Sequence, residues 1–390
     1  MSHPSGSPPA LAQTVHDLRR REFPWTAEST YLNNASIGPL PERTRRVLDE
    51  FTALRTAPNR LPDTLLMGGL AEARSAVARL LNAEVEEVAL ATNTSYGLNI
   101  AALSLPLEVG EAVLVSDKEF PANVYPWLLL RERGVTVELA PTTRNGWPNE
   151  DFLLERLRDP SVRILAVSFV QFSNGYRADL TRLGEACQAN GTYLVVDAIQ
   201  GVGQCPLDVR EIHVDMLACG AQKWLLSPWG SGFLYVKRDL IPELRPRLAG
   251  WLAFQGTDDF TQLTEYDPTF RADARRFELA TLPFQDLVGM TESIGLVLDV
   301  GIERIHTYLK QIRRPLLDAA DAGVLELASP IDSLHESSIV CVRTPHVEES
   351  FSALRNAGVV CVMREGSIRL SPHFYNTVEE IERVVEILEG

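Results

Sequence analysis

Two residues in the middle of the chain could perform covalent chemistry together. Asp197 follows one short apolar run, and Lys223 follows another, among Cys, Gly, Ala, Gln, Trp and Leu neighbours. A lysine in such apolar surroundings has a lowered pKa and becomes an amine nucleophile. Taken alone, Asp197 could equally cap a helix, and most lysines lie on the surface. The pair still predicts a carboxylate and a reactive amine at one edge of a sheet.

A third apolar run is followed by Asn93-Thr-Ser-Tyr-Gly, which opens a predicted helix. Thr94 and Ser95 could simply cap that helix, but hydroxyls and backbone N–H groups at a helix N-terminus also bind phosphate. The 52 acidic and 37 basic residues give a formal net charge of −15. This balance argues against a general nucleic-acid or anionic-membrane binder. An anionic ligand would therefore need such a local cradle.

One cofactor, pyridoxal phosphate, needs all of these groups together. It requires a lysine for its aldehyde, a carboxylate for its pyridinium nitrogen, a phosphate cradle and a side chain over its ring. Phe120, in the segment after a fourth apolar run, is the candidate for the ring. An amino-acid substrate adds the need for a cation, and Arg369 is the candidate because arginine binds carboxylates bidentately. Arginine is abundant in this chain, so spacing alone does not single Arg369 out.

The scaffold for these residues is indicated by seven short apolar runs. Many are apolar at consecutive positions, which is typical of strands covered on both faces, and amphipathic stretches alternate with them. We predict an α/β fold with a mainly parallel seven-stranded sheet and helices on both faces. Such sheets bind ligands at the carboxyl ends of their strands. The predicted strands are 87–92, 112–116, 136–140, 163–169, 192–197, 216–220 and 232–236.

The last hundred residues indicate a small α+β domain. A helix closed by Gly358 is followed by two strand-like runs, 359–363 and 367–370, and by a final helix whose capping box begins at Thr377. The predicted organisation is a flexible N-terminal segment, a discontinuous small domain and a large cofactor-binding domain. These parts span residues 1–28, residues 29–58 with 285–390, and residues 59–284, respectively.

The cysteines and the N-terminus suggest an intracellular protein. The five cysteines are scattered, with no C-x-x-C pair and no zinc spacing, which predicts buried reduced thiols and no metal site. The N-terminus lacks the apolar core of a secretory signal, and no run of about 18 apolar residues exists. We therefore expect a cytoplasmic protein that neither spans nor binds a membrane.

In these motifs the chain resembles the class V aminotransferase family of fold-type I pyridoxal-phosphate enzymes. That family includes cysteine desulfurases, kynureninases and isopenicillin N epimerase-like proteins. The resemblance covers residues 30 to 388 and depends on seven segments in the same order, each of them weak by itself. The segments are 31–35, 94–96, 119–127, 197–200, 222–223, 276–281 and 369–377.

The resemblance implies a role for each matched residue. Lys223 would form the Schiff base, Asp197 would hold the ring nitrogen, Gln200 would reach the ring oxygen or cover the ring, and Phe120 would stack on the ring. The remaining implied contacts concern the phosphate and the substrate. They involve Thr94, Ser95, Tyr96 and Gln222 for the phosphate, Thr281 for the phosphate across the interface of a homodimer, and Arg369 and Asn34 for the substrate.

Several positions depart from the family pattern. Gly220 stands where a phosphate-binding serine is common, and Ala280 replaces a glycine. Phe172 stands where many relatives carry an asparagine near the ring oxygen; Asn174 is two positions away, so that role is not transferred to it. Trp251 resembles a kynureninase tryptophan near the phosphate, although a packing role is equally compatible with the sequence.

The resemblance leaves the reaction open, because one fold supports many chemistries. We favour an aminotransferase-type reaction on an amino acid; the alternatives are a C–S lyase or other β-eliminating lyase, or an epimerase-like or kynureninase-like enzyme. A desulfurase needs a mobile nucleophilic cysteine, whereas Cys361 lies in a strand-like run. A dehydrogenase is disfavoured because Gly201-Val-Gly203 lacks the third glycine of the dinucleotide motif. A catalytically inactive regulator is disfavoured because no DNA-binding module is recognisable.

Overall fold

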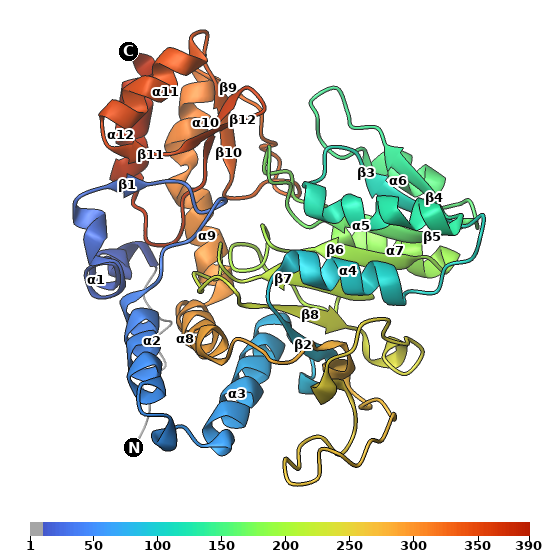
Figure 1. Ribbon diagram of the computed structural model, residues 1–390. Coiled ribbons are helices and arrows are strands. Elements are labelled where there is room, and N and C mark those ends of the chain that lie inside the picture. Colours follow the sequence, from blue (N-terminus) through green and yellow to red (C-terminus); the bar gives the residue numbers. More distant parts are fainter. Residues whose placement is uncertain (1–10) are drawn as a thin grey trace, which may run out of the picture.

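The computed structural model describes residues 11–390 (Figure 1). The flexibility expected for residues 1–10 lies outside the described residues. The prediction that the flexible segment continues to residue 28 is wrong for residues 11–28. These residues form helix α1 (Leu11–Glu22) and a 3₁₀ turn (Pro24–Ala27). Leu11, Val15 and Leu18 of α1 are buried, and the helix contacts α9 (Ile302–Ile312). Their i, i+4, i+7 spacing is a helical apolar stripe, which is the sequence signal for this helix.

The seven predicted strands form one sheet, with the order β2-β8-β7-β6-β5-β3-β4. Neighbours from β7 to β4 pair in parallel, whereas β8 is antiparallel to β7 and to β2. The predicted mainly parallel sheet is therefore confirmed. The strands are β2 (Val88–Ala91), β3 (Ala112–Ser116), β4 (Thr136–Ala140), β5 (Val162–Ser168), β6 (Tyr193–Asp197), β7 (Met216–Gly220) and β8 (Gly232–Val236).

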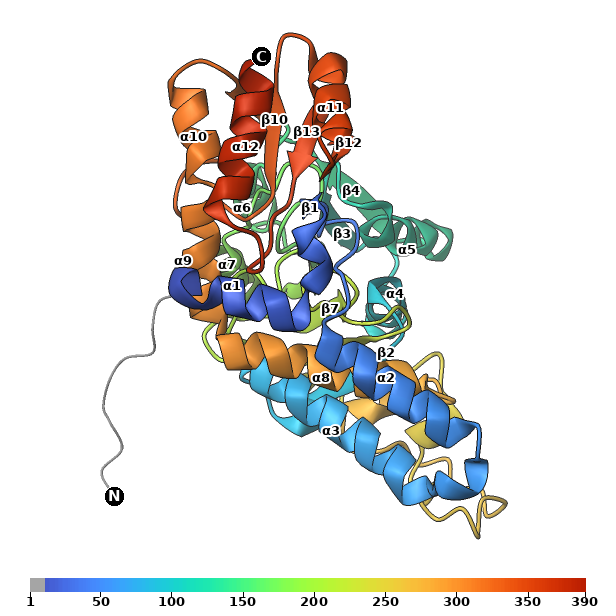
Figure 2. The same cartoon turned by 90° about the vertical axis from the view of Figure 1, so that its left-hand side faces the viewer.

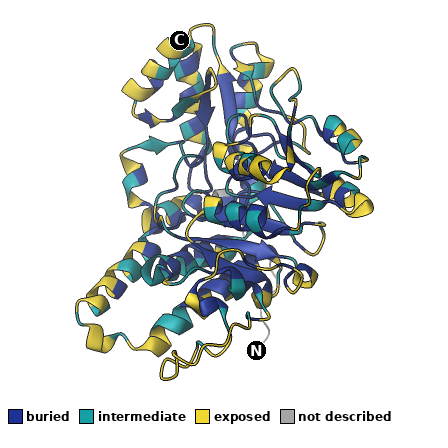
Figure 3. Cartoon of the chain, turned by 45° about the vertical axis from the view of Figure 1, so that its right-hand side comes forward, coloured by how far each residue is buried: buried dark blue, intermediate teal, exposed yellow. Residues whose placement is uncertain are grey.

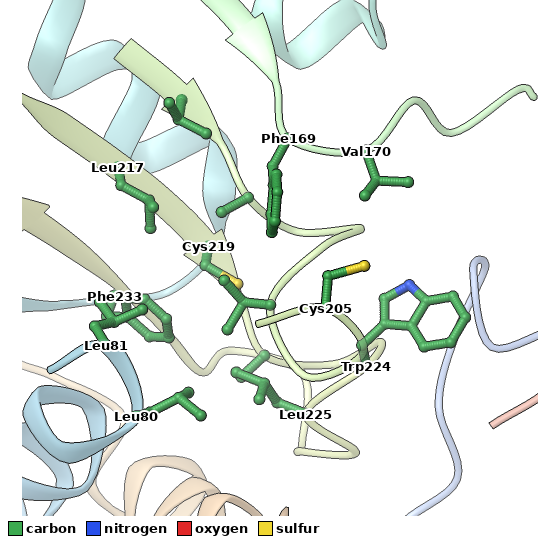
Figure 4. Close-up of a cluster of buried hydrophobic side chains, with 14 of the residues drawn as sticks. Leu80, Leu81, Phe169, Val170, Cys205, Leu217, Cys219, Trp224, Leu225 and Phe233 are labelled. Atoms are coloured by element: carbon green, nitrogen blue, oxygen red, sulfur yellow. The ribbon is translucent and has the colours of Figure 1, made fainter. Parts of the chain in front are cut away.

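Helices cover both faces of this sheet, which explains why its strands are apolar at consecutive positions. One face packs on α4 (Thr94–Ser104) and α5 (Tyr125–Leu128). The other packs on α3 (Asp63–Leu81), α6 (Glu150–Arg156), α7 (Leu180–Asn190) and α8 (Phe284–Val300). Figure 4 shows part of this second core, where Leu217, Cys219 and Phe233 of the sheet lie near Leu80 and Leu81 of α3. The buried strands and the exposed outer sides of the helices are visible in Figure 3.

A second sheet near the C-terminus is antiparallel, with the order β12-β13-β10-β9. Its strands are β9 (Glu326–Leu327), β10 (Val340–Arg343), β12 (Val362–Arg364) and β13 (Ser367–Leu370). One face packs on α10 (Arg314–Asp321), α11 (Val347–Asn356) and α12 (Val378–Glu389). The predicted capping box of α12 is confirmed at Thr377 and Glu380.

The predicted strand 359–363 is wrong as a single element. Its first half, β11 (Val359–Val360), pairs in parallel with β1 (Thr30–Tyr31), and its second half belongs to β12 of the small sheet. The chain therefore changes sheets at Cys361. Apolar periodicity does not reveal such a change, because both halves are strands.

The predicted domain boundaries remain a prediction. The prediction assigned α2 (Glu42–Arg55) and α8 to the small domain, but α8 packs on α3 of the large domain and α2 packs on α8. Figure 2 shows these three helices side by side below the small sheet. Among residues 11–390, no helix is both long and apolar enough to cross a membrane.

Candidate active site

A cavity of about 320 Å³ lies at the carboxyl ends of the central strands and is closed from the other side by the small sheet. Segments that follow β2, β3, β5, β6 and β7 contribute to it, as the sheet topology predicted. Three larger cavities elsewhere contain none of the predicted site residues, so size alone does not identify the site. The lining residues are Ala35, Ser36, Asn93, Thr94, Ser95, Phe120, Ala122, Phe172, Asp197, Ile199, Gln200, Gln222, Lys223, Arg364 and Arg369.

Lys223 projects into this cavity from the turn after β7. Burial lowers the pKa of its amine to about 8, although the carboxylate of Asp197 acts in the opposite direction. Its Nζ lies 5.6 Å from the centroid of the Phe120 ring. Gly38 packs so closely that a Cβ there would lie 2.1 Å from the Lys223 carbonyl oxygen. The backbone of Lys223 is thus held by a contact that only glycine permits.

Asp197 ends β6 and is almost completely buried. Its Oδ1 accepts a hydrogen bond from the Ile199 N–H at 3.1 Å. Burial raises its pKa to about 6, while the backbone hydrogen bond and the charge of Lys223 lower it. At neutral pH the cavity therefore contains a largely ionised carboxylate together with a lysine of reduced basicity. The structure thus brings Asp197 and Lys223 together in one cavity, as predicted.

Glu119, for which no role was predicted, is a second buried carboxyl group near Asp197. It accepts hydrogen bonds from the Ser168 N–H at 2.8 Å, from Gln171 Nε2 at 2.6 Å and from the Ser168 hydroxyl. Burial raises its pKa to about 7, and the charge of Asp197 adds to the rise. Since Ser168 is the register partner of Asp197, Glu119 ties the segment carrying Phe120 to the strand beside Asp197. Its position directly before Phe120 was the available signal.

The N-terminus of α4, where we predicted a phosphate cradle, lines the cavity. The side chain of Asn93 caps the helix by accepting the Tyr96 N–H at 2.9 Å, and Thr94 Oγ1 accepts the Gly220 N–H at 2.8 Å. A Cβ at Gly220 would lie 2.6 Å from Gln222 Oε1 and 3.2 Å from Thr94 Oγ1. The missing side chain at Gly220 therefore leaves room for the Gln222 amide beside Thr94. A side chain at residue 220 would have to displace this amide.

Three predicted residues do not line the cavity. The hydroxyl of Tyr96 donates to the Phe277 carbonyl, away from the cradle. Asn34 Nδ2 donates to the Ser371 carbonyl at 2.8 Å, and its Oδ1 accepts from the Tyr375 hydroxyl at 2.9 Å. Both polar atoms of Asn34 are thus engaged within the chain, while its neighbour Ser36 reaches the cavity. Thr281 is exposed, and its contact across a subunit interface stays a prediction.

Arg369 lines the cavity from β13 and is nearly fully buried. Its Nη1 donates to the Phe172 carbonyl and its Nη2 to the Ser36 hydroxyl, each at 2.7 Å. Its Nε is buried without a hydrogen-bond partner among the described residues. Burial lowers its pKa to about 10, so it stays a cation at neutral pH. A buried cation with a spare donor suits an anionic substrate group.

Four more lining residues shape the walls of the cavity. Gln200 donates to the Ala35 carbonyl at 2.9 Å and accepts from Trp224 Nε1 at 2.8 Å, so its orientation is fixed. Phe120 and Phe172 meet edge to face, with 5.2 Å between ring centroids. Arg364, at the end of β12, is an exposed lining residue that was not predicted to belong to the site. Nothing in its local sequence signals this position.

The remaining candidates lie away from the cavity. Asn174 donates from Nδ2 to the Gly146 carbonyl, and its Oδ1 accepts from the Tyr176 N–H. Asn174 does not line the cavity, and it was not assigned a role there. Trp251 packs edge to face on Phe260. All five cysteines are free and buried, and burial raises the pKa of Cys361 to about 11. Among residues 11–390, no group of His, Cys, Asp and Glu side chains could hold a metal ion.

Similarity to known proteins places this site in a family. Two C-DES structures, one with glycine covalently linked to the PLP cofactor and one of the cystine C–S lyase with its product cysteine persulfide, have TM-scores of 0.85 and 0.84. They cover 95% and 94% of this chain and 98% and 99% of theirs, at 20% and 22% identity. A cysteine desulfurase from Thermococcus onnurineus NA1 has a TM-score of 0.84 at 22% identity, covering 96% and 97% of the two chains. The fold is that of the fold-type I pyridoxal-phosphate enzymes.

Sequence comparison gives the family itself. The Aminotransferase class-V model matches residues 30–384. An uncharacterized aminotransferase, YcbU of Bacillus subtilis (strain 168), is 30% identical over 376 residues, which are 94% of this chain and 95% of the relative. A probable cysteine desulfurase of Methanothermobacter thermautotrophicus is 30% identical over 400 residues, covering 95% and 96%. The chain belongs to the aminotransferase class-V family, whose members use pyridoxal phosphate, and is an enzyme of that family.

Proposed function

We propose that the protein binds pyridoxal phosphate at Lys223 and acts on an amino acid, in an aminotransferase-type reaction. The observation that carries this proposal is the half-buried Lys223, with a pKa of about 8, in one cavity with Asp197 and Arg369. When bound, the cofactor supplies a ring that accepts electrons as a bond to the substrate α-carbon breaks.

The cavity residues fit this cofactor. Asp197, ionised at neutral pH, would keep a proton on the ring nitrogen, and Phe120 would cover the ring. Thr94, Ser95 and the free N–H groups of the first turn of α4 would bind the phosphate, with Gln222 beside them. These groups provide a local anion site in a chain of strongly negative net charge.

Lys223 and Arg369 would act on the substrate. Arg369 would bind the α-carboxylate through donors that its two protein contacts leave free. Lys223 Nζ would take the proton from the α-carbon and return one later in the reaction. A base with a pKa near 8 is suited to both directions at neutral pH. Water would be restricted by the small sheet over the cavity.

A β-eliminating reaction such as C–S cleavage is the second candidate. It is favoured by relatives named cysteine desulfurases and by the cystine C–S lyase fold. Elimination needs the same proton removal by Lys223 and no nucleophilic cysteine. Sulfur transfer through an enzyme cysteine is disfavoured, because all five cysteines are buried. Epimerase-like and kynureninase-like reactions share the first proton transfer and remain further alternatives.

A homodimer is part of the same proposal. Thr281 is exposed and does not line the cavity of its own chain. In a symmetric pair it would reach the phosphate of the other site. Sedimentation equilibrium should give twice the mass of the chain, and Thr281→Ala should weaken cofactor binding. A fully active monomer would contradict this arrangement.

The reaction is tested by incubating the holoenzyme with a panel of amino acids. Pyridoxamine phosphate and the matching keto acid indicate transamination, whereas pyruvate with sulfide or persulfide indicates elimination. Lys223→Ala is the control, and it should produce neither set of products. Products formed equally by Lys223→Ala would refute the assignment of the base.

A further inference from the structure

The cavity contains a second arginine for which the proposed function has no task. Arg364 and Arg369 lie on adjacent antiparallel strands, in which Val362 opposes Arg369 and Arg364 opposes Ser367. Opposed residues share a face, so the two arginines are diagonal neighbours on one face of the small sheet. The other face packs on helices through Val342, Ile368 and Leu370. Both guanidinium groups therefore belong to the side that closes the cavity.

The charges of the cavity are unbalanced. Its lining has three basic side chains, Lys223, Arg364 and Arg369, and one carboxylate, Asp197. Arg364 donates from Nη1 to the Met363 carbonyl at 3.0 Å, and no ion pair joins it to another described residue. The like charges of Arg364 and Arg369 each act on Lys223 and lower the pKa of its amine. Such an arrangement of cations suits a ligand that brings more than one negative group.

The proposed function accounts for all of these charges except that of Arg364. In that function Asp197 would hold the ring nitrogen, the N-terminus of α4 would hold the phosphate, and Arg369 would bind the α-carboxylate. On the basis of that function, we propose that Arg364 binds a carboxylate on the substrate side chain, and that the substrates are amino acids with a second acidic group. The ring of Phe172, which meets that of Phe120 edge to face, would flank the intervening methylene groups.

Comparing each acidic amino acid with its amide tests this inference, because the two differ mainly in charge. The holoenzyme is mixed with aspartate or asparagine, and with glutamate or glutamine, and kcat/KM is obtained from the change in the cofactor absorbance. The same measurements are made on Arg364→Gln, on Arg364→Lys and on a control, Arg355→Gln. Arg355 is exposed on α11 of the same domain and outside the cavity.

We expect the wild type and Arg355→Gln to prefer at least one acid over its amide. Arg364→Gln should reduce that preference about tenfold or more, mainly by raising KM for the acid, with little change for the amide. Arg364→Lys should recover part of the preference, because the charge is kept while the planar fork is lost. Cofactor affinity should stay unchanged in both variants.

Three results would overturn the inference. A wild type that reacts with amino acids but does not prefer an acid over its amide would refute it. So would an Arg364→Gln variant that slows acid and amide equally, or one that releases the cofactor, since Arg364 would then support the fold or the phosphate. A protein that binds no pyridoxal phosphate would instead refute the proposed function itself, and the two failures are thereby distinguished.

Discussion

The lowered pKa of Lys223 predicts a large difference in reactivity among the lysines of this chain. At pH 7.5 an amine with a pKa of about 8 is about one quarter unprotonated, against roughly 0.1% for an ordinary lysine with a pKa near 10.5. The neutral fraction is thus about 200-fold larger. The sequence has only Lys118, Lys223, Lys237 and Lys310, so each can be followed separately.

Asp197→Asn is the informative perturbation of this pKa. The carboxylate of Asp197 raises the pKa of Lys223, so its replacement by a neutral amide of similar shape should lower that pKa further, by about one unit. The variant amine would then be mostly neutral at pH 7.5. The variant should therefore react faster than the wild type with a small aldehyde below pH 8, although it loses the partner of the cofactor ring.

The assay is reductive methylation of the apoprotein with limiting formaldehyde and cyanoborohydride, from pH 6 to 10. Mass spectrometry of the lysine peptides gives a rate for each site, with the exposed Lys118 as the internal reference. The expected midpoint for Lys223 is near pH 8 in the wild type and lower in Asp197→Asn. A wild-type midpoint near 10, or an upward shift in the variant, would refute the reasoning.

Three further predictions concern the surroundings of the site. The pKa of Glu119 in the folded protein is about 7, above its ordinary value of 4.5. The folded state therefore binds this proton more tightly than the unfolded state, and the free energy of unfolding should fall by about 3 kcal/mol as the pH rises through 7. The difference in melting temperature between Glu119→Gln and wild type should therefore grow in favour of the variant from pH 5 to 8; a pH-independent difference would contradict this. Gly220→Ala should displace the Gln222 amide and weaken binding of pyridoxal phosphate several-fold, as measured by fluorescence titration. The protein should stay folded, because the flexible Gln222 side chain can move; an unchanged affinity would contradict this prediction. Arg74→Ala should cost about 3–5 kcal/mol in urea unfolding, because it leaves buried Glu278 without its bidentate partner; a loss below about 1 kcal/mol would contradict it.

The large sheet was predictable because burial on both faces imposes a strong local pattern. Each strand is apolar at consecutive positions, and Asp197 and Lys223 stand where the apolar runs stop. The topology rule then places both at one edge. The pairing of a carboxylate with a desolvated amine needed no knowledge of distant contacts.

The parts that were missed depend on contacts between distant segments. Glu119 becomes a buried, hydrogen-bonded group only because Ser168 and Gln171 come to it from another strand end. Arg364 reaches the cavity only because the small sheet closes over the large one. The change of sheet at Cys361 likewise depends on pairing with the N-terminal segment. Apart from the position of Glu119 directly before Phe120, these contacts leave no local pattern in the sequence.

The central claim is that Lys223 binds pyridoxal phosphate, and borohydride labelling tests it most directly. Purified protein loaded with the cofactor should be yellow, and borohydride should bleach the colour and fix one phosphopyridoxyl group on the peptide that contains Lys223. Lys223→Ala should bind the cofactor without becoming labelled. Absence of cofactor binding by the wild type, or a label on Lys118, Lys237 or Lys310, would contradict the account.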